Sequence, residues 1–165
     1  MRLYINEKLF SFHNRYFIKD ESGKDILEIS SKVISIGDKT WIRDLEGNEL
    51  IYIEQELFHL MPKYNVMINN KIEYSISKKF NLLKNDYILS NNYKVDGKFL
   101  NHNFTVYNNN GEKVGEIYRR YLTFGDQYVI DIYDDKDYLI VLSIIVAITN
   151  DIDRAQSNNT ASSSN

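Results

Sequence analysis

An almost uninterrupted apolar run near the C-terminus, YLIVLSIIVAI at residues 138–148, most constrains the fold. A membrane helix needs about 20 apolar residues, whereas the run through Thr149 has twelve, between the acidic segments DDKD and NDIDR. Such a length is typical of a helix buried in a protein core. A helix that is apolar on every face, with Ser143 as its single polar interruption, must be surrounded by other elements. A buried helix is therefore expected; a long strand and insertion into a membrane or a partner are the alternatives.

A repeated unit precedes this run and predicts the number of strands. Each unit has an apolar anchor, and a segment with strand character follows about six residues later. Turns rich in Asn, Asp and Gly, at 20–23, 44–47, 68–71 and 108–111, lead from several of these segments into a second one. The anchors, spaced by 19–24 residues, are Phe10, Ile34, Phe58, Phe80, Phe99 and Leu122. Six units of about two strands predict roughly twelve strands, joined mostly by hairpins.

A meander of this length must close on itself or split into two packed sheets. A closed barrel of about twelve strands is too wide for its own side chains to fill. A helix of twelve residues, about 18 Å long, would fill that space and would itself be covered. The sequence thus predicts a mainly β domain over residues 1–153, a closed antiparallel barrel around a central C-terminal hydrophobic helix. Asp135 or Asp137 is expected to cap the helix, and residues 154–165 are expected to be a disordered polar tail.

Composition narrows the class of protein. The formal net charge of -3 lacks the basic footprint of a nucleic-acid-binding domain. The chain has no cysteine, which excludes disulfides and thiolate metal sites and fits a reducing compartment. Asn6, Glu7 and Lys8 stand where a signal peptide would need an apolar run. We therefore expect a cytoplasmic protein.

Several motifs, in this order, resemble the bacterial LURP-one-related (YxjI-type) family, which has the tubby C-terminal-like fold. They are KLFSFHNRYFIKDESG at 8–23, the segment 35–71, YLTFGDQYVIDI at 121–132 and LIVLSIIVAITNDID at 139–153. The resemblance covers about residues 2–153 and implies a twelve-stranded barrel around a central helix. It implies little about activity. Tubby domains bind phosphoinositides through basic residues that have no match in this sequence, so none is carried over.

Phospholipid scramblases, more distant relatives by fold, bear an acidic calcium-associated segment before their C-terminal apolar helix. This sequence has acidic residues in a loosely similar place, but DIYDDKD lacks the glycine and the distal glutamate of a calcium loop of known geometry. They are weak calcium candidates by analogy: Asp131, Asp134, Asp135 and Asp137.

Basic residues cluster in two places, around SKKF and in YRRYL. If their outward-facing members converged on one side of the barrel, they would contact phosphate groups as charge-assisted donors; solvated strand faces and edge protection are the alternative. The candidate phosphate-contacting residues are Lys78, Lys79, Lys84, Arg119 and Arg120.

Catalytic and metal-binding motifs do not stand out. The sequence contains no GxSxG, HExxH or P-loop. His13, His59 and His102 lack the spacing of metal ligands and are expected to be exposed turn residues. Trp41, the only tryptophan, is expected in the core.

The predicted function is a non-catalytic cytosolic binding or scaffold module without a cofactor. Its ligand is either an anionic lipid head group or a protein partner. The alternative is a scramblase-like membrane-associated protein in which the C-terminal segment leaves the barrel, and a hydrolase is the third option.

Overall fold

The computed structural model describes residues 1–6, 15–33, 37–79, 86–122 and 127–162. The strands and helices are β1 (Arg2–Asn6), β2 (Arg15–Lys19), β3 (Asp25–Val33), β4 (Asp38–Asp44), β5 (Glu49–Gln55), β6 (Lys63–Ile68), β7 (Lys71–Lys79), β8 (Asp86–Leu89), β9 (Lys94–Lys98), the 3-10 helix η1 (Phe99–Asn101), β10 (Asn103–Tyr107), β11 (Lys113–Arg120), β12 (Gln127–Ile132), the 3-10 helix η2 (Asp135–Asp137) and α2 (Tyr138–Ser162).

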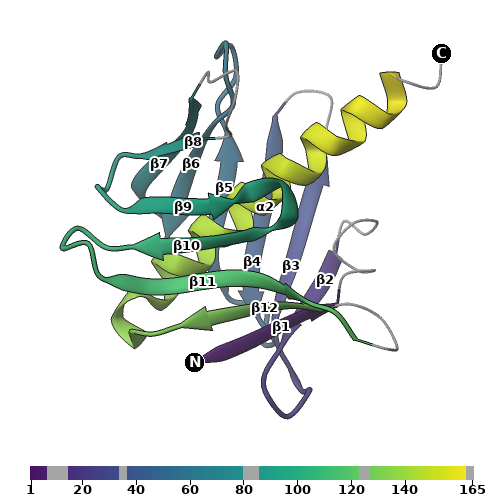
Figure 1. Cartoon of the computed structure of the whole chain (residues 1–165), viewed down its shortest axis with the longest axis vertical. Helices are drawn as coiled ribbons and strands as arrows, with labels where there is room; N and C mark the ends of the chain where they lie inside the picture. Colours follow the sequence, from purple (N-terminus) through teal and green to yellow (C-terminus); the bar gives the residue numbers. More distant parts are fainter. Residues whose placement is uncertain (7–14, 34–36, 80–85, 123–126, 163–165) are drawn as a thin grey trace.

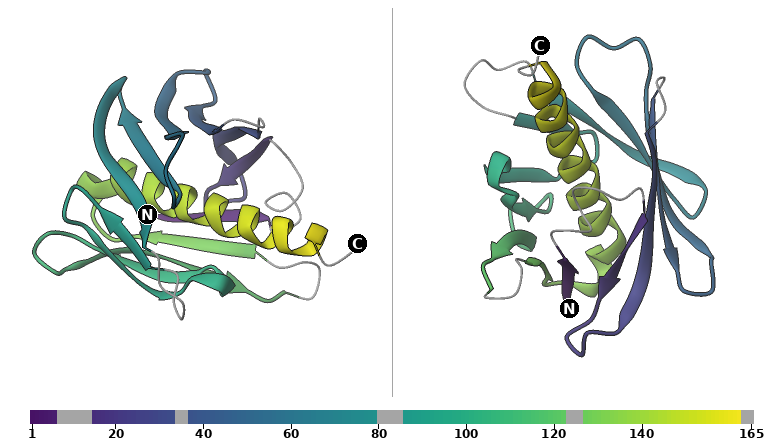
Figure 2. Two further views of the ribbon diagram at one scale, coloured as in Figure 1. Left: turned by 90° about the horizontal axis from the view of Figure 1, so that it is seen from above. Right: turned by 90° about the vertical axis from the view of Figure 1, so that its right-hand side faces the viewer.

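All twelve strands belong to one antiparallel sheet with the order β8-β7-β6-β5-β4-β3-β2-β1-β12-β11-β10-β9. Strands that are adjacent in this order are consecutive in the sequence, with one exception: the first strand β1 pairs with the last strand β12 as well as with β2. The sheet curls around α2, so that β1 and β9–β12 lie on one side of the helix and the remaining strands on the other (Figures 1 and 2). The predicted twelve-stranded barrel is thereby confirmed. It is nearly closed: the two edge strands β8 and β9 share no hydrogen-bonded ladder within the described part of the chain.

The apolar run forms the first half of α2 and lies in the centre of the barrel (Figure 2). Side chains from Val141 to Ile148 are at most 1% exposed, which confirms the predicted buried helix. Its single polar interruption is satisfied inside the core. The Ser143 hydroxyl donates to the Ile140 carbonyl oxygen over 2.8 Å and shares a 2.5 Å hydrogen bond with the Tyr74 hydroxyl. The Ser143 hydroxyl is therefore buried without losing its hydrogen bonds.

The hairpin turns follow the sequence prediction. The backbone N–H groups of Ser22 and Lys24 donate to the Asp20 carboxylate, which holds the turn between β2 and β3. Asn69 and Asn70 adopt positive φ angles of 51° and 62° between β6 and β7, the conformation that two-residue hairpin turns require.

The start of α2 differs from the predicted cap. The 3-10 helix η2 precedes α2, and the Asp134 carboxylate accepts a hydrogen bond from the Lys136 backbone N–H. Asp137 instead accepts from the Tyr93 hydroxyl over 2.6 Å. The capping carboxylate is thus Asp134, because the extra 3-10 turn moves the first free N–H groups upstream.

Residues 154–162, which we expected to begin a disordered tail, are the last turns of α2. These turns project beyond the barrel (Figure 1). The Arg154 guanidinium is bound to Asp38 at the start of β4 and to Gln55 at the end of β5. These bonds attach the first of the projecting turns to the barrel rim.

Gly115 on β11 allows α2 to approach the sheet, and Gly115→Ala is expected to destabilise the protein. A Cβ atom at this position would lie 2.3 Å from Val141 Cγ1, and overpacking of this kind costs about 1–3 kcal/mol. Val141→Ala removes the clashing methyl group, so the double variant should lose less stability than the sum of the single losses. Urea unfolding of the three variants measures this, and strictly additive losses would show that the contact is absent.

Candidate functional site

The polar side chains that follow the apolar run gather where α2 leaves the barrel. Asn150, Asp151, Asp153 and Arg154 are all bonded to the barrel rim. We call these residues and their partners the exit cluster: Asp38, Thr40, Gln55, Tyr64, Lys78, Tyr87, His102, Asn150, Asp151, Asp153 and Arg154.

The centre of the exit cluster is the buried carboxylate of Asp151, which is 4% exposed. It accepts hydrogen bonds from the hydroxyl groups of Tyr64 and Tyr87, over 2.9 and 2.8 Å, and from the Lys78 ammonium over 2.8 Å. The three donors come from β6, β8 and β7. A buried carboxylate is tolerated only when it is paired and hydrogen-bonded, and Asp151 meets both conditions.

Register brings Lys78 into the barrel. Alternate residues of a strand point to the same face, and Lys78 follows the buried Tyr74 and Ile76 on the inward face of β7. Burial, and secondarily the Asp151 carboxylate, raises the pKa of the Tyr64 and Tyr87 phenols well above the usual range. Both tyrosines therefore remain neutral hydrogen-bond donors to Asp151.

Two further bonds tie the helix to β4. Arg154 forms an ion pair with Asp38, and Asn150 donates from its amide to the Thr40 hydroxyl over 3.0 Å. Burial raises the pKa of Asp38, and the nearby Arg154 charge opposes this shift. The cluster therefore holds the helix at its exit by charged and neutral bonds together.

His102 belongs to the exit cluster, which corrects the prediction of an exposed turn histidine. It is 6% exposed, with its Nε2 atom 2.9 Å from Asp153 Oδ1 and its ring edge-on to Tyr128. After the short helix η1, a left-handed conformation at His102 (φ 50°) precedes β10. His102 and Asp153 are 51 residues apart, so spacing along the chain did not reveal that Asp153 would bond this histidine.

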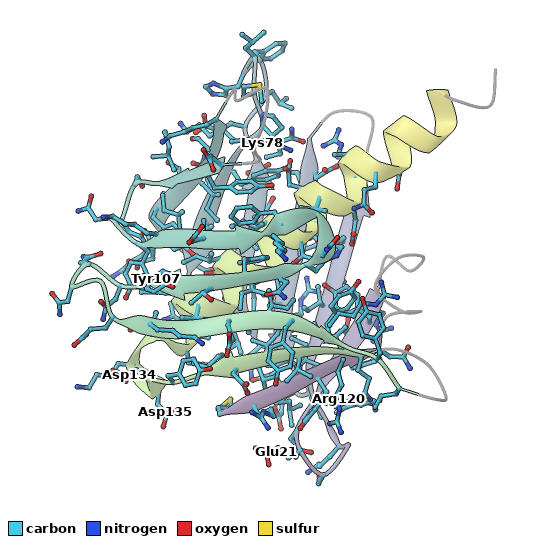
Figure 3. All side chains as sticks on the ribbon, viewed as in Figure 1. Glu21, Lys78, Tyr107, Arg120, Asp134 and Asp135 are labelled. Carbon is cyan, nitrogen blue, oxygen red and sulfur yellow. The ribbon has the colours of Figure 1, made fainter. Side chains whose placement is uncertain are left out.

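The structure describes four of the five predicted phosphate-contacting residues, and their surroundings differ. Lys78 is bonded to Asp151, whereas Lys79, next to it on β7, is exposed. Arg119 lies over the Tyr121 ring at 5.0 Å, and Arg120 is exposed at the end of β11. Figure 3 shows Lys78 in the upper part of the molecule and Arg120 at its lower right, on different sides of the sheet order. Lys84 lies outside the described residues.

The acidic segment before α2 is likewise dispersed. Arg2 binds Asp131 with two bonds of 2.6 and 2.9 Å, and this guanidinium lowers the pKa of Asp131. Asp137 is bonded to Tyr93, while Asp134 and Asp135 are exposed at the turn (Figure 3). Among the residues that the structure describes, no group of three or more His, Asp or Glu side chains is placed to hold a metal ion. Of the four weak calcium candidates, Asp131 and Asp137 are thus bonded to different partners, and Asp134 and Asp135 are exposed.

His59 and Trp41 also have defined places, and His13 lies outside the described residues. His59 is exposed, as expected, with its Nε2 atom 2.6 Å from Glu56. Trp41 is half-buried on the outer face of the barrel, because Thr40 and Ile42 on either side of it point inward. Its ring lies 5.3 Å from that of Tyr52, under the Arg43 guanidinium. The prediction of a core tryptophan was wrong.

Chemically, the exit cluster is suited to anchoring. Its central carboxylate is saturated by three donors, and its arginine is bonded to Asp38 and Gln55. In the described part of the chain, no helix combines the length and the apolar character needed to cross a membrane.

A nearly closed twelve-stranded barrel around a hydrophobic helix is the tubby C-terminal-like architecture. The LURP-one-related family model matches residues 1–149, so the chain belongs to the LURP-one-related family. It is 28% identical over 150 residues to the uncharacterized protein YxjI of Bacillus subtilis (strain 168), covering 90% of this chain and 91% of that protein. An X-ray structure of a protein from Arabidopsis thaliana shares the fold, with a TM-score of 0.63, 18% identity and coverage of 90% and 89% of the two chains.

Proposed function

We propose that this protein is a non-catalytic binding module that contacts the head groups of anionic lipids with the end of the barrel at which α2 exits. The observation that carries the proposal is the filled interior. Six larger aliphatic side chains of α2, from Val141 to Ile148, are completely buried. Because helix and exit cluster occupy the barrel, a ligand is expected to bind on its outer surface.

Charge at the exit end supports an anionic ligand. The carboxylates of Asp38, Asp151 and Glu56 are each paired with a cation of the protein. Lys79, at the end of β7, is exposed to solvent. Asp86 is its partner in the β7–β8 ladder, and we propose that the exposed ammonium of Lys79 donates to a phosphate oxygen of the head group.

The scramblase-like alternative requires α2 to leave the barrel. Exposing six buried aliphatic side chains would cost on the order of 10 kcal/mol, which is comparable to the whole stability of a domain, about 5–15 kcal/mol. The buried bonds of Asp151 would also be lost. The observed packing therefore favours a module that keeps its helix inside.

Vesicle flotation tests the proposal. We expect the protein to float with phosphatidylcholine vesicles that contain phosphatidylserine, and to bind less at raised salt, because exposed charge interactions are screened. Lys79→Gln should weaken binding about fivefold, since a basic residue near an anionic surface contributes about 1 kcal/mol.

Lys24→Gln is the matched control. Lys24 is also exposed, and it comes just before β3, after a turn that lies at the opposite end of the barrel from the end of β7. Equal losses for both variants would indicate a general effect of net charge. Failure to float with any anionic vesicle would contradict head-group binding and leave a protein partner as the ligand.

A further inference from the structure

The loop between β5 and β6, residues 56–62, exposes large apolar side chains at its tip. Phe58 is 101% exposed and Leu60 is 97% exposed, with Leu57 beside them at 42%. Phe58 adopts a φ of 64°, a conformation that is uncommon for a bulky residue. Residues held in such conformations persist only when the surrounding structure determines them, and they are concentrated at functional positions.

The base of this loop is tied to the barrel. The Glu56 carboxylate accepts hydrogen bonds from the Lys63 ammonium and the Asn65 amide, over 3.1 and 2.8 Å, and lies 2.6 Å from the His59 ring. The Glu56 backbone N–H donates to the Lys63 carbonyl, and the Lys78 N–H donates to the Pro62 carbonyl. Glu56 thus holds the loop on β6, and Pro62 connects it to β7.

The tip lies at the same end of the barrel as the exit cluster. In an antiparallel meander, alternate connections lie at the same end, so the β5–β6 loop shares an end with the far end of β7, where Lys79 stands. The turns after β2, β4 and β6 lie at the opposite end (Figure 1). The apolar tip of the loop and the exposed Lys79 therefore lie at the same end of the barrel, where both are open to solvent.

The shape and charge of this end suit a bilayer. Phenylalanine and leucine are the side chains that interfacial elements insert at the boundary between head groups and acyl chains, and a bilayer accepts them without a complementary pocket. The loop's own carboxylate is paired with Lys63, and Asp38 and Asp151 are paired with Arg154 and Lys78. Three carboxylates at this end are thus paired with cations of the protein, while Lys79 is exposed beside Asp86, its partner in the β7–β8 ladder.

We infer that the β5–β6 loop inserts Phe58 and Leu60 into the interfacial region of a lipid bilayer, while Lys79 contacts head groups at the same end. This inference rests on the proposed function and adds an apolar anchor to it. The insertion contributes a salt-resistant part of binding, whereas the Lys79 contact is screened by salt.

The first test measures depth. In a Trp41→Phe background, tryptophan at position 58 (Phe58→Trp) reports on the tip, and Leu45→Trp reports on the exposed turn at the opposite end. With phosphatidylcholine–phosphatidylserine vesicles carrying brominated acyl chains, position 58 should be quenched and position 45 should not. Absence of quenching at position 58 in vesicle-bound protein, or equal quenching at both positions, would overturn insertion.

The second test measures affinity by flotation. The double variant Phe58→Ser/Leu60→Ser should lose at least tenfold in binding at raised salt, whereas Leu45→Ser/Ile72→Ser, which removes two exposed apolar residues elsewhere, should bind like the wild type. Both doubles change exposed positions, so their melting temperatures should match the wild type and confirm that they are folded.

These outcomes separate the inference from the proposed function. Binding that survives Phe58→Ser/Leu60→Ser but falls with Lys79→Gln overturns insertion and retains head-group contact. Salt-resistant binding that depends on the tip and is indifferent to Lys79→Gln supports insertion and contradicts the head-group proposal. A dimer in sedimentation that the tip variant converts to a monomer, with unchanged vesicle binding, overturns insertion and assigns the tip to a second copy of the chain.

Discussion

Ile145→Asp is expected to unfold the domain. Ile145 is completely buried in the centre of the barrel. Loss of a buried isoleucine side chain costs about 2–5 kcal/mol, and an uncompensated buried charge adds several kcal/mol. The sum reaches the stability of a typical domain, about 5–15 kcal/mol. Circular dichroism and a thermal melt should show the loss of cooperative unfolding.

Two variants control this experiment. Ile145→Ala removes the same side chain without adding a charge, so it should remain folded with reduced stability. Leu45→Asp places the same charge in the exposed turn between β4 and β5 and should melt like the wild type. A folded Ile145→Asp protein with an unchanged melting temperature would show that the helix is not enclosed.

Asp151→Asn is expected to destabilise the protein by about 3–5 kcal/mol, because it leaves Lys78 charged and largely buried without its carboxylate. Lys78→Met should also be destabilising, because the buried Asp151 carboxylate keeps its bonds from Tyr64 and Tyr87 but loses its counter-charge. Urea unfolding of both variants measures these losses. An Asp151→Asn protein of wild-type stability would mean that the exit cluster does not hold the helix.

A double-mutant cycle isolates the ion pair. Lys78→Met/Asp151→Leu removes both charges, and its loss should be smaller than the sum of the Lys78→Met and Asp151→Leu losses by about 1–3 kcal/mol. Lys79→Met is the control within the same strand: Lys79 points outward, so its replacement should change stability by no more than about 0.5 kcal/mol. The comparison thus separates the effect of the inward-pointing Lys78 from that of the outward-pointing Lys79.

Local patterns were sufficient for the strands and turns. Period-two alternation in ELIYIEQ and the turn residues DESG and NNNG act within a few residues, so they predict hairpins without any tertiary information. The alternation also contained signals that we did not use. Lys78 is in phase with Tyr74 and Ile76, which places it inside, and Trp41 lies out of phase with Thr40 and Ile42, which places it outside.

The candidate site was harder to predict because its members come together only when the barrel forms. Asp151 is 87 residues from Tyr64 and 73 from Lys78, so their spacing along the chain carries no signal. Asp131, Asp134, Asp135 and Asp137 are close in sequence, yet Asp131 and Asp137 are bonded to Arg2 and Tyr93 instead. Proximity in the chain suggested a metal site, but Asp131 on β12 and Asp137 in η2 are bonded to different partners.

The sequence by itself determined the architecture, because hydrophobic periodicity, turn residues and the length of one apolar run follow from local backbone geometry and from the need to bury apolar surface. Only the tertiary structure decided which polar groups are bonded to one another and which apolar side chains stay exposed. The Lys78–Asp151 ion pair depends on the register of β7 against the end of α2, which no short segment encodes, and the exposure of Phe58 depends on how the β5–β6 loop is held on the barrel.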